Sequence, residues 1–367
     1  MFGYAGTGKS TLAVEFTSPS TIFAAFTGKA AHVLRRKGIP ARTIHSLIYH
    51  PRDRSRVRLE ELRAEHEAVS KTEPLDEATI FMLKYEIKKE ERSVKQPHFV
   101  LNVDSEVRTC ELLVIDEVSM VGMEMGEDLL SFGRKVLVLG DPGQLPPVAS
   151  GGFFTNAPPD RLLTEVHRQV AQSPVILLAS DVREGRGVSL GRYGNSRVLL
   201  RGDLAPGVIY DNHDQILCGR NETRRTINRR VREHLACTSP YPEPGERVVC
   251  LRNNNDNGLL NGGTWTVDSC EELTGGPLLL KVTDGDQTIE TLAHRGPFLG
   301  QEVSFFEARD ADSFDFGYAL TVHKSQGSQW PSVYVVDESA AFRGDAARWL
   351  YTAVTRAADR VTIAVSK

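Results

Sequence analysis

The chain has 367 residues, of which 40% are hydrophobic and 25% are charged, and its formal net charge at pH 7 is −4. This length favours two packed domains, and the composition is ordinary for a globular protein. The negative charge excludes a globally basic surface, so a nucleic-acid partner would have to be held by a local groove of donors.

The sequence carries no pattern of a membrane or secreted protein. No apolar run approaches the roughly 20 residues that cross a bilayer, and residues 1–10 lack the basic and apolar regions of a signal peptide. The five cysteines are scattered and none forms a CxxC pair, which argues against a zinc site or a disulfide framework. We therefore expect a cytoplasmic protein without membrane contact.

The first motif lies at the start of the chain, where residues 3–10 read GYAGTGKS and match G-x-x-x-x-G-K-[ST]. Glycines let backbone amides turn inward around phosphates, and the predicted helix from Lys9 to Phe16 directs its positive end at them. Lys9 would reach the β- and γ-phosphates, and the Ser10 hydroxyl would ligate Mg²⁺. The predicted nucleotide-binding residues here are Gly3, Gly6, Thr7, Gly8, Lys9, Ser10 and Thr11.

Short apolar runs predict the strands of parallel sheets that helices cover on both faces. These runs are Ile22–Phe26, Leu112–Ile115, Val136–Leu139 and Val333–Val336. Each of the first three leads into a polar loop, where ligands bind in open α/β sheets. The sequence therefore predicts an α/β protein whose chemistry lies in these loops.

Two segments depart from this pattern. Residues 53–95 are rich in Glu, Arg and Lys, and we expect a charged helical insertion, about 51–105, lying over the first domain. A solvated helix pair without chemistry is the favoured interpretation of this segment. In residues 245–306, the runs Val248–Leu251 and Thr264–Val267 flank Asn261-Gly262-Gly263, which predicts two strands, a tight turn and a small β-rich insertion. Between the domains, Pro174 starts a predicted helix that Gly185 ends. The expected domains are residues 1–160 and 161–367.

The acidic pair Asp116-Glu117 follows the second predicted strand. Asp116 would hold Mg²⁺, and Glu117 would polarise an attacking water. An acidic pair at a strand end is also common on protein surfaces, but its place after an apolar strand in a chain with the first motif favours catalysis. Gln144 lies in the loop after the third strand, and its amide is suited to sensing a γ-phosphate.

A phosphate loop serves kinases, GTPases, transporters and motors alike, so the remaining loops must identify the class. Seven segments are informative: Thr27–Ala31 (TGKAA), Thr43–Leu47 (TIHSL), Asp116–Met120 (DEVSM), Gly140–Val148 (GDPGQLPPV), Arg168, Thr321–Gly327 (TVHKSQG) and Thr352–Ala357 (TAVTRA). In this order they resemble the motif set of superfamily-1 helicases. The DEVSM and HKSQG forms are similar to RecD-like and phage Dda-like members, which move 5′ to 3′.

The resemblance implies two RecA-like P-loop NTPase domains, with ATP and Mg²⁺ in the cleft between them. It implies that Arg168 and Arg356 act as arginine fingers on the developing phosphoryl charge. His167 stands where relatives often carry a Tyr that stacks on adenine, with a packing role as the alternative. The implied catalytic residues are Lys9, Asp116, Glu117, Gln144, Arg168 and Arg356.

The resemblance also implies contacts with single-stranded DNA along loops of both domains. The expected contacts are Lys29, Thr43, His45, His323 and Lys324. Phe99 is a candidate for the aromatic pin that Dda-like relatives carry near this position, although a buried strand residue is the favoured alternative. A further basic cluster spans Arg220 to Arg232. We favour a solvated helix here over a groove that binds DNA.

These observations predict a monomeric, ATP-dependent 5′ to 3′ DNA helicase that translocates on single-stranded DNA in a bacterial or phage-infected cell, with replication or recombination proteins as further partners. One alternative is the motor subunit of an ATP-dependent exonuclease or recombination complex whose nuclease site lies in a partner. Another is a nucleotide-dependent switch or an inactive remnant, against which the intact catalytic set argues.

The start of the chain departs from the family pattern. The phosphate loop of P-loop ATPases follows a buried strand, usually of about 5 residues, but only Met1 and Phe2 precede Gly3. We expect a slot in the first sheet, the loss of upstream residues that help to hold adenine, and a poorly soluble or weakly active 367-residue form. We also expect the reading frame to continue upstream with an apolar run that ends at Phe2.

Overall fold

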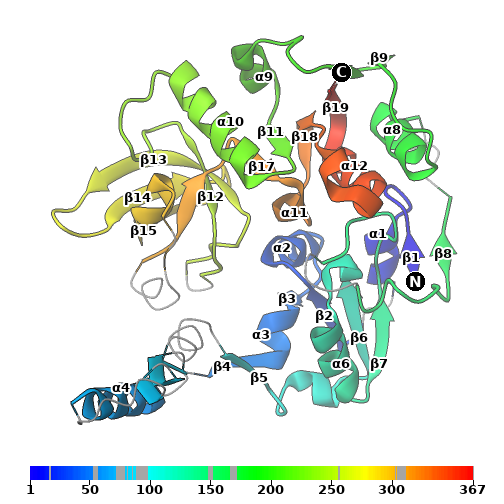
Figure 1. Cartoon of the computed structure of the whole chain (residues 1–367). Helices are drawn as coiled ribbons and strands as arrows, with labels where there is room; N and C mark the ends of the chain where they lie inside the picture. The colour runs from blue at the N-terminus through cyan, green and yellow to red at the C-terminus, as the bar shows by residue number, and fades with distance from the viewer. Residues whose placement is uncertain are drawn as a thin grey trace.

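Two α/β domains lie one above the other, with a β-rich unit on one side and a helical arm projecting below that unit (Figure 1). The computed structural model describes residues 1–15, 18–52, 57–71, 79–80, 82–84, 86–87, 98–147, 152–165, 172–254, 257–301, 303 and 311–366. Among these residues, no helix combines the length and the apolar character that crossing a bilayer requires.

The first domain is built on a parallel sheet with the strand order β3-β2-β6-β7. Its strands are β2 (Thr21–Ala25), β3 (Ala41–Thr43), β6 (Leu112–Asp116) and β7 (Lys135–Val138). Its helices are α1 (Lys9–Val14), α2 (Gly28–Arg36), α3 (Ile44–Ile48), η1 (Glu106–Thr109), η2 (Val118–Met120) and α6 (Met123–Ser131). The three strands predicted here are confirmed. The apolar runs of β2 and β6 are largely buried beneath helices, as with Phe23 and Ile115, whereas the run of β7 is half-buried.

A two-residue strand occupies part of the slot expected beside β7. Strand β1 (Phe2–Gly3) pairs in parallel with β8 (Leu162–Leu163), and Gly3 N donates to the Gly140 carbonyl at 3.0 Å. Phe2 is 2% exposed. The slot is therefore filled over this length, and β8 pairs with the first domain although it follows the boundary expected at residue 160.

The second domain contains a six-stranded sheet with the order β17-β11-β18-β19-β10-β9. Its strands are β9 (Gly191–Tyr193), β10 (Ser196–Leu200), β11 (Gln215–Cys218), β17 (Ala319–Thr321), β18 (Trp330–Val336) and β19 (Ala357–Val365). Its helices are α8 (Pro174–Arg183), α9 (Pro206–Asn212), α10 (Asn221–His234), α11 (Val322–Ser325), η5 (Ser339–Asp345) and α12 (Ala346–Val354). The fourth predicted strand lies within β18, and the helix predicted from Pro174 is α8, so both predictions are confirmed.

The β-rich insertion is a five-stranded antiparallel sheet with the order β15-β14-β13-β12-β16. It comprises β12 (Arg247–Cys250), β13 (Thr264–Glu272), β14 (Leu278–Thr283), β15 (Thr288–Ala293), η3 (Gly296–Leu299) and β16 (Phe314–Phe316), and so extends beyond residue 306. Strands β12 and β13 pair as predicted, but Cys250 and Thr264 are joined by a connection longer than a tight turn, of which residues 251–254 and 257–263 are described. This loop reaches the first domain, where a Cβ on Gly28 would lie 2.9 Å from Leu260 Cδ2.

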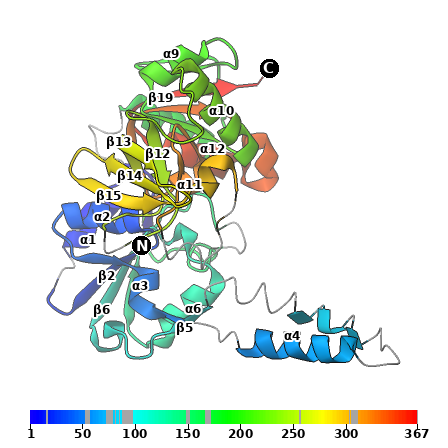
Figure 2. The same ribbon diagram turned by 90° about the vertical axis from the view of Figure 1, so that its left-hand side faces the viewer.

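The charged insertion leaves the first domain as an antiparallel ribbon of β4 (Tyr49–Arg52) and β5 (His98–Leu101). Helix α4 (Val57–Ser70) points away from the first sheet in both views, rather than lying over it as expected (Figure 2). The expectation was wrong because α4 has no apolar stripe that could pack on the domain. Leu62 is buried, but most of the described helix is exposed.

Candidate functional site

The phosphate-binding loop joins β1 to α1 and forms a cradle around Lys9. Gly6 and Gly8 have φ angles of 80° and 76°, in the left-handed region that favours glycine. Lys9 Nζ donates to the carbonyl oxygens of Gly3 at 2.7 Å and Tyr4 at 3.0 Å. A Cβ on Gly3 would lie 2.5 Å from Thr7 Oγ1, so this position accommodates only glycine. The spacing of the motif therefore produces the expected loop.

Asp116 and Glu117 stand at the carboxyl end of β6, facing the same cleft. Glu117 has a φ of 56°, which is strained for a residue other than glycine, and such strain is found preferentially at functional sites. Its backbone N–H donates to Asp116 Oδ1 at 2.9 Å. Burial raises the pKa of the Glu117 carboxyl, while Arg356 acts in the opposite direction.

The loop after β7 binds the second domain through Tyr351, which lies on α12. The Tyr351 hydroxyl donates to Asp141 Oδ2 at 2.7 Å and accepts from the Ala5 backbone N–H at 3.0 Å. Asp141 is 2% exposed and also accepts from Gly143 N at 2.9 Å, and burial raises its pKa. One hydroxyl thus joins the phosphate loop, the loop after β7 and the second domain.

Two further hydrogen bonds cross between the domains at Leu145. Leu145 N donates to Thr352 Oγ1 at 2.9 Å, and Gln326 Nε2 donates to the Leu145 carbonyl at 3.0 Å. Thr352 and Gln326 belong to two segments that the sequence marked near the end of the chain. The structure therefore connects three of the marked segments directly.

Arg356 and Lys29 bring positive charge to the cleft from opposite domains. Arg356 is 6% exposed, and its guanidinium donates to the carbonyls of Thr352 and Ser328, both at 3.1 Å. Lys29 Nζ lies 4.7 Å from the centre of the Trp330 ring. Burial, aided by Arg356, lowers the pKa of Lys29 to about 8. The sequence predicted that Lys29 contacts DNA. In the structure it lies in the first turn of α2 and lines the cleft.

The cleft has a volume of about 520 Å³, and its chemistry suits a polyphosphate with Mg²⁺. Lys9, Lys29 and Arg356 line it with Asp116, Glu117, Gly6, Gly8, Thr11 and Gln144. Gln144 Oε1 is buried and has no hydrogen-bond partner among the described residues, so it is free to meet a ligand or water. His167, Arg168 and the side chain of Ser10 lie outside the described residues.

Three of the predicted DNA-contacting residues lie together at the base of the ribbon. Thr43 caps α3 by accepting from Ser46 N at 3.2 Å. The ring of His45 lies 5.8 Å from that of Phe99 and 5.5 Å from that of Tyr49. Phe99 is 43% exposed, so the favoured alternative of a buried strand residue was wrong. The ribbon places Phe99 at the surface because β4 and β5 have no further strand partner among the described residues.

His323 and Lys324 lie on α11, which follows β17 of the second domain. Thr321 caps this helix by accepting from Lys324 N at 3.4 Å, and the side chain of Lys324 is exposed. Gly327 has a φ of 74°, and a Cβ there would lie 2.6 Å from Thr27 Oγ1. Because of this close approach, the segment Thr321–Gly327 of the second domain lies against the start of α2 in the first domain. The two segments predicted to contact DNA are therefore neighbours.

Sequence reasoning missed Asp141, Tyr351 and Trp330. Asp141 lay in the polar loop that follows a predicted strand, inside the marked segment Gly140–Val148, so its position was a usable signal. Tyr351 stands directly before the marked segment Thr352–Ala357, but its partner Ala5 is 346 residues away in the chain. We find no local signal in the sequence that separates Trp330 from an ordinary core residue.

Two family models match the chain. Residues 1–201 match the model described as an AAA domain, and residues 316–364 match that of a UvrD-like helicase C-terminal domain. The chain is 30% identical over 280 residues to the ATP-dependent RecD2 DNA helicase of Deinococcus radiodurans, covering 68% of this chain and 36% of that protein. It is 27% identical over 283 residues to the RecBCD enzyme subunit RecD of Mycolicibacterium smegmatis, covering 69% and 50%. It therefore spans half or less of these relatives.

Solved structures share the fold. A Bacteroides Pif1 helicase bound to single-stranded DNA has a TM-score of 0.54 at 18% identity, covering 98% of this chain and 87% of that one. The Pif1 helicase of Candida albicans has a TM-score of 0.52 at 18% identity, covering 100% and 90%. The AAA-domain match spans more than half of the chain, and the fold is two RecA-like domains. The chain thus belongs to the AAA-domain family, and it is similar to RecD-type helicases in sequence and to Pif1 helicases in fold.

Proposed function

We propose that this protein is a DNA helicase that hydrolyses ATP between its two RecA-like domains and moves along single-stranded DNA. The observation that carries the proposal is the hydrogen bonding across the cleft. Tyr351 joins Asp141 to the phosphate loop, and the same cleft holds Lys9, Glu117 and Arg356. A site assembled from both domains responds to the distance between them, which is what a motor requires.

Each residue of the cleft has a distinct task in this proposal. Lys9 and the loop amides hold the phosphates, and Asp116 holds Mg²⁺, which would neutralise charge on them when bound. Glu117 orients the attacking water and accepts its proton, and its strained backbone keeps the carboxylate directed into the cleft. Arg356 stabilises the charge that develops on the transferred phosphoryl group. Arg168 is proposed as a second arginine finger, and His167 as a contact for adenine.

ATP hydrolysis would be coupled to DNA binding through the segment Thr321–Gly327, which contacts the cleft and also carries predicted DNA contacts. Gln326 donates to Leu145 beside the cleft, and only one residue separates it from Lys324 on the DNA face. Closing the cleft around ATP would therefore shift α11 relative to α3. Thr43, His45, His323 and Lys324 contact the DNA backbone without reading its sequence.

Phe99 is proposed as the pin that separates strands. Its exposed ring lies at the base of the projecting ribbon, next to His45. An aromatic ring at the edge of a single-strand track can stack on the last base and block its partner strand. The 5′ to 3′ direction is proposed from the resemblance to RecD-like and Dda-like helicases.

The second candidate function is the motor subunit of a recombination complex. It is favoured by the 27% identity to a protein named as a subunit of the RecBCD enzyme. In that case a partner would supply the nuclease, and the isolated chain would bind DNA and hydrolyse ATP without unwinding efficiently.

The deciding test measures ATP hydrolysis with and without single-stranded DNA, followed by unwinding of duplexes with a 5′ or a 3′ tail. The proposal expects strong stimulation by DNA, steep loss of DNA affinity with salt, and unwinding from 5′ tails. A rate indifferent to DNA would refute the motor. Unwinding from 3′ tails alone would refute the direction.

A further inference from the structure

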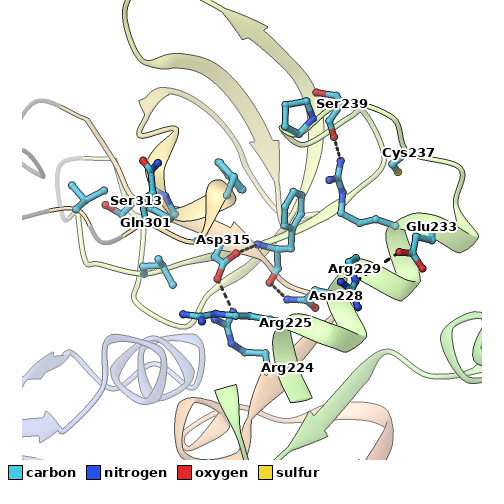
Figure 3. A pocket seen from close by; sticks show the side chains of 18 of the residues that line it. Arg224, Arg225, Asn228, Arg229, Glu233, Cys237, Ser239, Gln301, Ser313 and Asp315 are labelled. Carbon is cyan, nitrogen blue, oxygen red and sulfur yellow. Dashed lines mark hydrogen bonds and ion pairs between the residues drawn. The ribbon is translucent and has the colours of Figure 1, made fainter. Parts of the chain in front are cut away.

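A groove of about 940 Å³ separates α10 of the second domain from the β-rich unit. One wall is the arginine-rich face of α10, and the other is built by η3, β16 and the loop after β12 (Figure 3). Leu251, Pro297, Val303 and the edge of Phe298 form its apolar lining. This groove contains the helix that the sequence indicated to be only a solvated surface.

Two of the arginines in the groove hold its walls together. Arg224 binds Asp315 on β16 at 2.6 Å, and both side chains are largely buried. Arg232 binds Glu246 at 2.8 Å and covers the face of the Phe316 ring at 4.2 Å. Their charge is neutralised by carboxylates, so these two residues are structural.

Two other arginines of the groove, Arg225 and Arg229, have no close, buried carboxylate partner among the described residues. Arg225 is exposed and has no carboxylate within 4.0 Å among the described residues. Arg229 reaches Glu233 only at 3.7 Å, with the two side chains 71% and 65% exposed, so solvent screens this pair. One turn of helix separates Arg225 from Arg229, which places both on the groove face of α10. The groove therefore presents two available guanidinium groups beside an apolar floor.

The groove is continuous with the proposed DNA face. Its Arg224 end faces Lys324: burial lowers the pKa of that lysine, the charge of Arg224 lowers it further, and the charge of Asp315 acts in the opposite direction. The loop that lines the groove at Leu251 and Arg252 continues to Gly262, where a Cβ would lie 3.5 Å from the Lys324 carbonyl oxygen. In Figure 3, Arg224 and Arg225 lie at one end of the groove and Ser239 at the other.

We propose that this groove extends the single-stranded DNA track beyond Lys324, with Arg225 and Arg229 binding successive backbone phosphates. The proposal rests on the proposed function, because it names a further part of the same binding surface. Guanidinium groups on a helix suit phosphates without reading sequence, and the apolar floor tolerates any base edge. The walls are held by the two structural ion pairs, so the groove is preformed before DNA enters.

The test compares Arg225→Ala/Arg229→Ala with the matched control Arg230→Ala. Arg230 is exposed on the same helix but does not line this groove. Affinity for oligo(dT) of increasing length is measured by fluorescence anisotropy at several salt concentrations, and thermal melting checks the fold of each variant. The double variant should bind short oligonucleotides like the control and should lose about tenfold in affinity for long ones, with a log–log salt slope smaller by about 1.4.

Other outcomes overturn the proposal. If the double variant matches the Arg230→Ala control at every length, the groove does not hold DNA and α10 is a solvated helix. If short and long oligonucleotides weaken equally, the arginines act within the main track and do not extend it. A wild-type chain that binds no oligonucleotide would refute the proposed function itself, and that result is distinguishable because it needs no variant.

Discussion

The nucleotide cleft and the DNA face are built in opposite ways. The cleft contains buried, hydrogen-bonded groups from both domains, as Asp141, Tyr351 and Arg356 illustrate. The proposed DNA face consists of short helices capped by residues such as Thr43, and of exposed side chains such as Lys324 and Phe99. The difference teaches that chemistry is localised in a few fixed groups, while affinity for a long polymer is spread over many weak ones.

The largest effect is expected in the cleft. Lys9→Ala should weaken nucleotide binding and abolish turnover, and Glu117→Gln should bind ATP but hydrolyse it about 10²–10⁴-fold more slowly, because general-base catalysis is lost. Nucleotide binding and single-turnover hydrolysis separate the two roles, with Lys281→Ala, at an exposed position of β14, as control. Near-normal turnover by Glu117→Gln would contradict its assignment.

The second-largest effect is expected from removing the Tyr351 hydroxyl, which links the first domain to the second. Tyr351→Phe removes the hydroxyl shared by Asp141 and Ala5, and leaving buried groups unpaired costs about 1–3 kcal/mol. We expect stimulation by DNA to fall about tenfold or more while basal hydrolysis falls less. Tyr193→Phe is the control, since its hydroxyl donates to the Ser189 carbonyl at an exposed site. Equal losses with and without DNA would show that Tyr351 supports folding alone.

A smaller effect is expected on the DNA face. Phe99→Ala should reduce unwinding of a forked duplex several-fold, since one base–aromatic stack contributes about 1–3 kcal/mol. ATP hydrolysis stimulated by single-stranded DNA should change little, because the other contacts remain. Val103→Ala, at a nearby position that is 62% exposed, serves as control. Unwinding and hydrolysis that decline together would indicate a general loss of DNA binding instead of a pin.

The smallest effect concerns Lys29, where the cleft and the marked segment of α2 meet. Its pKa is lowered to about 8, so its charge is lost as pH rises through that value. The KM for ATP should then rise a few-fold between pH 7 and 9, while Lys29→Arg, which stays charged, should show a flatter profile. A wild-type profile that matches the arginine variant would exclude Lys29 from nucleotide binding.

The same shift has a definite consequence for stability. The unfolded chain holds a proton on Lys29 up to a pH near its ordinary value of 10.5, whereas the folded chain releases it near 8. Between these values the unfolded state binds more protons, so this residue makes stability rise with pH. Lys29→Met should remove this contribution, which chemical denaturation at pH 7.5 and 9.5 can measure.

The sequence by itself determined the parts that depend on neighbours in the chain. The glycine spacing around Lys9 dictates a loop with left-handed turns, and the apolar run before Asp116 dictates a buried strand with its acids at the carboxyl end. The threonines that open three marked segments cap helices by local hydrogen bonds at Thr27, Thr43 and Thr321. Such features need few residues, so a pattern is sufficient to predict them.

Only the tertiary structure decided which groups meet across the fold. The bond between Ala5 and Tyr351 joins residues separated by 346 positions, and no local period encodes it. The placement of Lys29 in the cleft, the outward direction of α4 and the groove beside α10 likewise depend on how two domains and an insertion pack. Packing selects among faces that a helix pattern leaves equivalent, and so it decides which charges face ATP, DNA or solvent.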